Sequence, residues 1–118
     1  MNEFVLRKAT LPNDQVADIR ISDGVIVEIG SDLAGAEMID CSGLRVLPGF
    51  VDLHTHLREP GFEQSETVLT GSQSAAVGGF TAVHAMANTQ PVADNAAVVE
   101  QVYALGQKAG YVDVFPIG

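Results

Sequence analysis

The sequence contains few basic residues, a single cysteine and no long apolar run. Lys and Arg number six against fifteen Asp and Glu, which gives a formal net charge of −9. Because no cluster of Lys or Arg is present to neutralise phosphates, neither nucleic acid nor an anionic membrane surface is expected as a partner. Cys41 cannot form a disulfide within the chain, and without a second cysteine nearby it indicates no zinc-binding motif.

Two further absences concern the location of the protein. No apolar run approaches the roughly 20 residues of a membrane-spanning helix, and the first residues lack the basic and apolar regions of a signal peptide. We therefore expect a cytoplasmic protein. With 118 residues, 47% hydrophobic and 18% charged, the composition is that of a globular protein that can build one core but not two complete ones.

The first 47 residues contain short segments rich in Val, Ile and Leu, separated by polar turns. Strands are predicted over 4–8, 16–22, 25–29 and 45–47, with a tight hairpin turn at 22–24. Between residues 17 and 22 apolar and polar side chains alternate, which predicts one buried face and one solvated face, with Asp18 on the solvated one. This pattern predicts a small antiparallel β-layer, which we assign to residues 1–49 as the N-terminal part of a β-sandwich-like domain.

After Pro48 and Gly49 strand-like and helix-like segments alternate. Strands are predicted over 50–57, 81–87 and 111–117. Helices are predicted over 66–77, capped by Ser65, and from a cap at Asp94 to an end at Gly110. This order is typical of a parallel βαβαβ segment, which we assign to residues 50–118.

Two histidines lie two residues apart in the strand predicted over 50–57. Because side chains alternate along a strand, Asp52, His54, His56 and Arg58 are predicted to share one face. His54 and His56 would lie about 7 Å apart at Cα, close enough to bind one metal ion, and imidazole suits zinc, iron or nickel better than calcium or magnesium. An antiparallel strand with a solvated face would show the same alternation. The βαβ context favours the metal site, because such folds place their chemistry at the C-terminal ends of strands.

Several segments resemble a known family. Residues 48–61, PGFVDLHTHLREPG, resemble the N-terminal signature of the amidohydrolase superfamily, and the ending LREPG resembles its dihydroorotase branch. Also similar are GGFT at 78–81, MANTQP at 86–91, with Ala87 where proline is commoner, and VDVFPIG at 112–118. The resemblance implies a (β/α)8 TIM barrel after the β-layer. Because such a barrel takes about 250 residues, we expect this chain to be an N-terminal portion that is inactive without the rest of the barrel.

The resemblance also implies the residues of the site. His54 and His56 would bind one metal of a binuclear zinc centre whose other ligands come from later strands, so that no catalytic residue lies within this chain. Arg58 and Asn88 would hold the substrate carboxylate, since a guanidinium binds a carboxylate through two hydrogen bonds and an amide NH₂ donates. Without the motif, a surface arginine and a turn-forming asparagine would be the simpler interpretations.

Two other polar residues near the motif receive no firm role. Asp52 fits either an acceptor that orients an imidazole or a polar group at the bottom of the barrel. His84 fits a hydrogen-bonded core histidine better than a ligand, because the motif gives it no function.

The implied activity is that of a dihydroorotase, which interconverts N-carbamoyl-L-aspartate and dihydroorotate by metal-bound hydroxide in de novo pyrimidine biosynthesis. Hydantoinases and allantoinase share the His-x-His motif and the barrel and stay open as alternatives, as does a non-catalytic module that binds a partner or complements a fragment.

Homo-oligomers are common in the family. The strands predicted at 50–57 and 111–117 would both be unprotected edges, so we expect the isolated chain to aggregate or to persist only when paired with its missing half.

Overall fold

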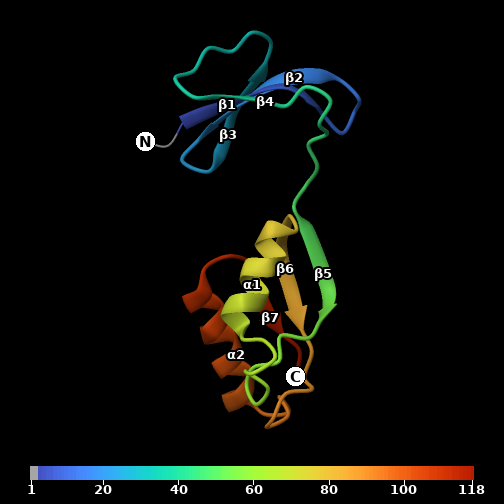
Figure 1. Cartoon of the computed structure of the whole chain (residues 1–118), viewed down its shortest axis with the longest axis vertical. Helices are drawn as coiled ribbons and strands as arrows, with labels where there is room; N and C mark the ends of the chain where they lie inside the picture. Colours follow the sequence, from blue (N-terminus) through green and yellow to red (C-terminus); the bar gives the residue numbers. More distant parts are fainter. Residues whose placement is uncertain (1–2) are drawn as a thin grey trace. The chain divides into compact units, whose positions relative to one another are not determined.

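The computed structural model of the protein describes residues 3–118, which divide into two compact units between Pro48 and Gly49. Residues 1 and 2, which belong to the predicted first domain, lie outside the described residues. The N-terminal unit is a four-stranded sheet with the order β3-β2-β1-β4 (Figure 1). Its strands are β1 (Glu3–Thr10), β2 (Val16–Ser22), β3 (Val25–Gly30) and β4 (Met38–Asp40).

The first three strands pair antiparallel, as the sequence predicts. The fourth differs from the prediction, because β4 pairs parallel with β1 and the segment predicted as a strand at 45–47 contributes only an isolated bridge between Arg45 and Thr10. A three-residue strand with every side chain exposed has too little pattern to be recognised in the sequence. Its position is set by the free edge of β1.

Asp18 is buried, which corrects its predicted place on a solvated face. In β1 the residues Arg7 and Lys8 form a bulge opposite it, since Leu6 pairs with Ile19 and Ala9 with Ala17. The Asp18 carboxylate accepts the backbone N–H of Lys8 at 2.8 Å and lies 2.9 Å from Arg7 Nε. These partners, the Lys8 N–H foremost, hold the pKa of Asp18 below its ordinary value of 3.8.

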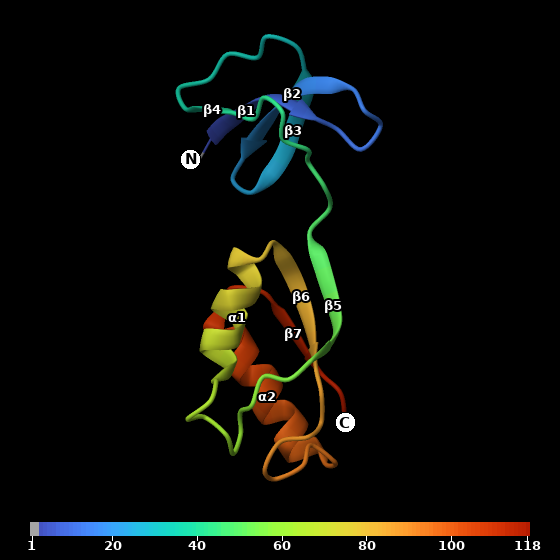
Figure 2. The same cartoon turned by 45° about the vertical axis from the view of Figure 1, so that its right-hand side comes forward.

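The C-terminal unit is a parallel three-stranded sheet with the order β5-β6-β7. Figure 2 shows α1 and α2 on the same side of this sheet. The elements in chain order are β5 (Phe50–Thr55), α1 (Val68–Val77), β6 (Phe80–Ala85), α2 (Ala96–Ala109) and β7 (Asp113–Pro116). The core between sheet and helices is built mainly from Leu57, Val68, Val83, Ala85, Val102, Val112 and Val114. This arrangement confirms the predicted βαβαβ order.

Both helices begin later than the sequence predicts. The cap of α1 is Thr67 rather than Ser65, because the Thr67 side chain accepts the Thr70 N–H at 3.1 Å while the Thr70 hydroxyl accepts the Thr67 N–H at 3.0 Å. The cap of α2 is Asn95 rather than Asp94. Several neighbouring residues can cap a helix, and backbone geometry selects one. No helix within residues 3–118 is long and apolar enough to cross a membrane.

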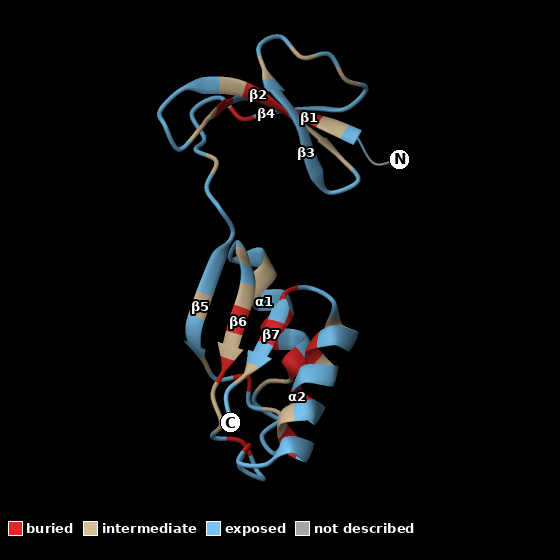
Figure 3. Cartoon of the chain, turned by 180° about the vertical axis from the view of Figure 1, so that it is seen from behind, coloured by how far each residue is buried: buried red, intermediate tan, exposed pale blue. Residues whose placement is uncertain are grey.

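The face of the sheet opposite the helices carries exposed apolar side chains. Val51 of β5 is 52% exposed and Phe115 of β7 is 43% exposed, and both strands are coloured largely as exposed in Figure 3. The strands β5 and β7 are the outer strands of the sheet, as predicted, and each has only β6 as a hydrogen-bonded neighbour within residues 3–118. The unit is therefore open on one face and at both edges.

Candidate metal centre

A β-bulge in β5 contains His54, the first of the two histidines. Asp52 pairs with Val83 of β6 and Thr55 pairs with Ala85, so β5 has two residues where β6 has one. Val83 and Ala85 are buried beneath the helices, and their partners Asp52 and Thr55 therefore face the helices too. This corrects the prediction that Asp52 shares a face with His54, because the extra residue shifts the alternation by one position.

His54 and His56 lie together on the opposite face of the sheet. Thr55 and Leu57, which alternate with them, face the helices, and Leu57 is only 3% exposed. The two imidazole rings are 5.1 Å apart between centroids, with an angle of 67° between their planes, and both residues are exposed. Two imidazoles this close can each offer a nitrogen to one metal ion.

Asp52 contributes to the site through the backbone. Its Oδ1 accepts the N–H of His54 at 3.0 Å, and this bond is the main reason why the pKa of Asp52 lies below its ordinary value. The bond stabilises the bulge, since the N–H of a bulged residue is not paired in the ladder. Asp52 thus fixes the backbone of His54 and not an imidazole ring.

The loop after β6 brings Asn88 to the histidines. Asn88 Oδ1 lies 2.8 Å from His56 Nδ1. The loop is held from within, because the carbonyl of Ala87 accepts the N–H of Thr89 at 2.9 Å and that of Ala93 at 3.0 Å. The Thr89 hydroxyl donates to the Pro91 carbonyl at 2.7 Å. The sequence predicts Asn88 as a site residue but gives no sign of its contact with His56.

The loops after β5 and β6 are joined by a contact that we call the clasp, formed by Pro60, Gly61 and Gln90. The Gln90 N–H donates to the Pro60 carbonyl at 2.9 Å. Gly61 has a φ of +104°, and a Cβ on it would lie 2.4 Å from the Gln90 carbonyl oxygen. Only glycine allows this approach of the two backbones. The clasp fixes the loop of Arg58 relative to that of Asn88.

Arg58 and His84 are placed differently from one another. Arg58 is exposed with a φ of +56°, and its side chain makes no hydrogen bond or ion pair with any of residues 3–118. His84 is half-buried rather than in the core, with its Nδ1 3.4 Å from the Asp52 carbonyl oxygen and its ring tilted at 5.3 Å from Phe115. Arg58 is therefore available to a ligand, whereas His84 has partners of its own.

The chain offers part of a metal site. Across the described range, residues 3–118, no group of three or more His, Cys, Asp or Glu could hold a metal ion. A zinc site takes roughly four ligands, of which imidazole nitrogens are common members. His54 and His56 fit as two of these ligands, and a complete site needs further donors.

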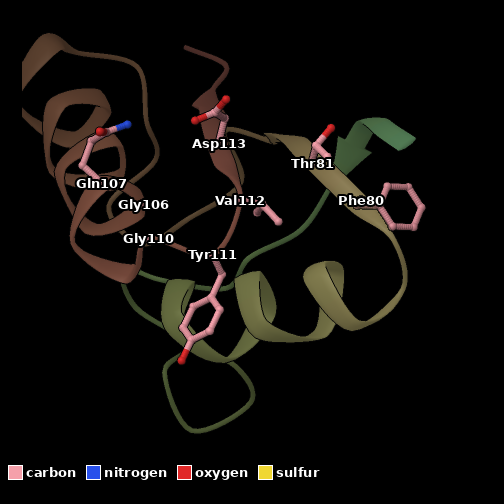
Figure 4. A pocket seen from close by; sticks show the side chains of 8 residues that line it. All are labelled: Phe80, Thr81, Gly106, Gln107, Gly110, Tyr111, Val112 and Asp113. Carbon is pink, nitrogen blue, oxygen red and sulfur yellow. The ribbon is translucent and has the colours of Figure 1, made fainter. Parts of the chain in front are cut away.

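A separate cavity of about 240 Å³ lies away from the histidines (Figure 4). It is bordered by the end of α2 and the beginnings of β6 and β7, with Thr81, Gln107 and Asp113 around it. In open parallel sheets ligands bind outside the carboxyl ends of the strands, and this cavity is at the amino ends. The histidine end of the sheet is the better candidate for chemistry.

Comparison with known proteins agrees with the motif. A family model described as dihydro-orotase-like matches residues 43–118. The chain belongs to the dihydroorotase-like family. It is 60% identical over 117 residues to the dihydroorotase of Leifsonia xyli, covering 98% of this chain and 27% of that relative. It is 54% identical over 120 residues to the dihydroorotase of Streptomyces coelicolor, covering 100% of this chain and 28% of the relative.

Solved structures show the same fold as this dihydroorotase-like chain. L-Hydantoinase (dihydropyrimidinase) from Arthrobacter aurescens superposes with a TM-score of 0.79 at 26% identity, over 100% of this chain and 28% of that one. A D-hydantoinase superposes with a TM-score of 0.69, also at 26% identity, over 98% of this chain and 26% of that one. These neighbours are amidohydrolase barrel enzymes, which confirms the predicted fold: the β5-β6-β7 unit is an incomplete (β/α)8 barrel. The chain spans about a quarter of the length of the curated relatives that it matches.

Proposed function

We propose that the protein is a metal-dependent hydrolase of cyclic amides, a dihydroorotase, that interconverts dihydroorotate and N-carbamoyl-L-aspartate in pyrimidine biosynthesis. The observation that carries this proposal is the meeting of two exposed imidazoles with Asn88 at the carboxyl ends of β5 and β6, next to Arg58. Curated relatives named dihydroorotase, up to 60% identical, support the choice of reaction.

His54 and His56 would hold zinc through ring nitrogens, as two ligands of a binuclear centre whose other ligands lie outside the described residues. Bound zinc at this place supplies activation of a water molecule and polarisation of the ring carbonyl. The chain itself fixes the positions of the two histidines. Asp52 fixes the backbone of His54, and the bulge keeps both imidazoles on the face away from the helices.

Arg58 and Asn88 would bind the carboxylate that dihydroorotate carries next to its ring. The guanidinium of Arg58 has no partner within residues 3–118, so both of its N–H edges are available for a carboxylate. In a chain with a net charge of −9, an unpaired arginine beside the histidines offers local attraction for an anionic substrate. Asn88 adds amide N–H donors from the neighbouring loop.

A second candidate is a hydantoinase activity, favoured by the superposition on L-hydantoinase. Its substrate ring need not carry a carboxylate, so Arg58 would have no charged group to bind. The incomplete ligand set is also compatible with a non-catalytic module. Sequence identity of 60% to a dihydroorotase against 26% to the hydantoinase favours the first candidate.

The test is a substrate comparison with the protein in the longest form that its gene encodes. Hydrolysis of dihydroorotate, hydantoin and allantoin is measured in parallel, with the 118-residue chain assayed alongside. We expect turnover of dihydroorotate by the longer protein, none by the 118-residue chain, and a growth requirement for added pyrimidine when the gene is disrupted. Turnover of hydantoin without dihydroorotate would favour the hydantoinase alternative. If the longer protein hydrolyses none of the three substrates and binds no zinc, the non-catalytic module is favoured.

The Arg58→Ala variant separates substrate binding from metal binding. It should raise the KM for dihydroorotate by about tenfold or more, since a lost charge-assisted hydrogen bond costs about 1.5–3 kcal/mol. Zinc content should be unchanged because Arg58 contacts neither histidine. An unchanged KM would remove Arg58 from the substrate site.

A further inference from the structure

The contact between Asn88 and His56 determines more than the position of a substrate ligand. Asn88 Oδ1 lies 2.8 Å from His56 Nδ1. A carbonyl oxygen only accepts hydrogen bonds, and a neutral imidazole has one donor and one acceptor nitrogen. The contact is therefore a hydrogen bond only if Nδ1 carries the proton. The lone pair is then on Nε2.

We propose that Asn88 is a positioning residue for His56, which holds the imidazole as the Nδ1–H tautomer and directs Nε2 toward the metal; this rests on the proposed function. Histidines that bind metals commonly donate their second ring N–H to an acceptor that fixes tautomer and ring orientation. The usual acceptors are carboxylates, backbone carbonyls and water. In this chain the acceptor is a neutral amide oxygen from the next loop.

The surroundings of His54 and His56 support Asn88 as the residue that orients the His56 ring. His56 is the one histidine of the pair whose ring has a side-chain hydrogen-bond partner among residues 3–118, since Asp52 contacts His54 through its backbone N–H. Asn88 in turn is held by a loop with a buried threonine, Thr89, and by the clasp at Gln90. A fixed acceptor can select one ring orientation, whereas a mobile one would follow the ring.

The proposal gives the two ends of one amide different tasks. The Asn88 oxygen accepts from His56, and the NH₂ group stays free to donate to the substrate carboxylate. Metal binding and substrate binding would then share a single side chain. The two tasks respond differently to substitution, because aspartate keeps an acceptor oxygen at this position but has no amide donor.

The experiment compares Asn88→Asp, Asn88→Ala and Asn88→Leu in the protein as its gene encodes it, with Arg58→Ala as the control for a loss of substrate contact alone. The ring tautomer is read from ¹⁵N shifts of labelled histidine, with the His56 signals assigned from their loss in His56→Gln. Zinc affinity is measured by competition with a chelator, and KM with dihydroorotate.

We expect Nδ1–H at His56 in the unaltered protein and in Asn88→Asp, together with retained zinc affinity and a raised KM in the latter. Asn88→Ala and Asn88→Leu should lose the Nδ1–H preference and bind zinc about 10–100-fold more weakly. The leucine variant fills the same space, so agreement between the two separates the lost hydrogen bond from a loosened loop.

Two results would overturn the proposal: an Nε2–H tautomer at His56 in the unaltered protein, or Asn88→Ala and Asn88→Leu variants that keep both tautomer and zinc affinity while only KM rises. Failure of the proposed function is a distinct result. If dihydroorotate is not hydrolysed but the Asn88 variants still change the tautomer and the zinc affinity, the substrate assignment is wrong and the positioning role stands.

Discussion

Replacing Gly61 with alanine tests whether the clasp holds the two site loops together. At a φ of +104° an L-residue is strained, by about 1–2 kcal/mol. The added Cβ would also lie 2.4 Å from the Gln90 carbonyl oxygen and 2.9 Å from its Cα. Backbone atoms cannot rotate out of the way as a flexible side chain can, so the loops must separate, at an overpacking cost of about 1–3 kcal/mol.

Separation of the loops would also break the bond from the Gln90 N–H to the Pro60 carbonyl, which contributes about 1 kcal/mol. Because part of the clash is relieved as this bond is lost, the terms do not add fully. We expect Gly61→Ala to lower the free energy of unfolding by about 2–4 kcal/mol. The KM for dihydroorotate should rise, since the loop of Arg58 moves away from that of Asn88.

The matched control is Gly110→Ala in the same unit. Gly110 also has a positive φ, +68°, but the nearest atom to an added Cβ is 4.0 Å away. This variant carries the backbone strain without the clash, at about 1–2 kcal/mol. Urea unfolding followed by far-ultraviolet circular dichroism gives both values in the longest form of the protein. Equal losses for the two variants would refute the clasp.

Three further predictions concern packing, acid stability and association. Gly106→Ala should destabilise by about 1–2 kcal/mol in urea unfolding, because a Cβ 2.5 Å from Val114 Cβ outweighs the gain in helix propensity, and a variant as stable as the unaltered protein would contradict this. The pKa of Asp18 is lowered in the folded protein, so its charge stabilises the fold above the pKa of the unfolded chain, and this contribution is lost as pH falls through the folded pKa. The difference in Tm between Asp18→Asn and the unaltered protein should therefore shrink below pH 3.8. The 118-residue chain should self-associate in light scattering through the edges of β5 and β7, and a cooperative monomeric unfolding transition would contradict this.

The pattern of consecutive residues was sufficient to predict most helices and strands of the chain. The strand from Val16 to Ser22 has the predicted bounds, and α2 ends at Gly110 as predicted, because alternation and a left-handed C-terminal glycine are properties of consecutive residues. Both predicted caps were wrong, because Thr67 caps α1 in place of Ser65 and Asn95 caps α2 in place of Asp94. The sequence contains the candidates, and the backbone at the start of the helix selects among them.

Pairing between distant segments was not readable in the same way. The bulge in β5 exists only relative to β6, and it decides that Asp52 faces the helices, whereas Asp18 is buried by its contacts with Arg7, Lys8 and Leu33. One extra residue in a strand reverses the face of the sheet on which the residues before it lie, relative to an uninterrupted alternation. Alternation along one strand therefore predicts the faces correctly only as far as the first bulge.

The order of residues is enough to place two histidines two positions apart at the end of a strand, within a motif that resembles that of an amidohydrolase. Spacing and residue type are local, so they needed no fold. The contact of Asn88 with His56, 32 residues away, and the close approach of the two loops at Gly61 are visible only in the folded chain. Such contacts depend on the parallel register of β5 and β6, which brings the ends of both strands to one edge of the sheet.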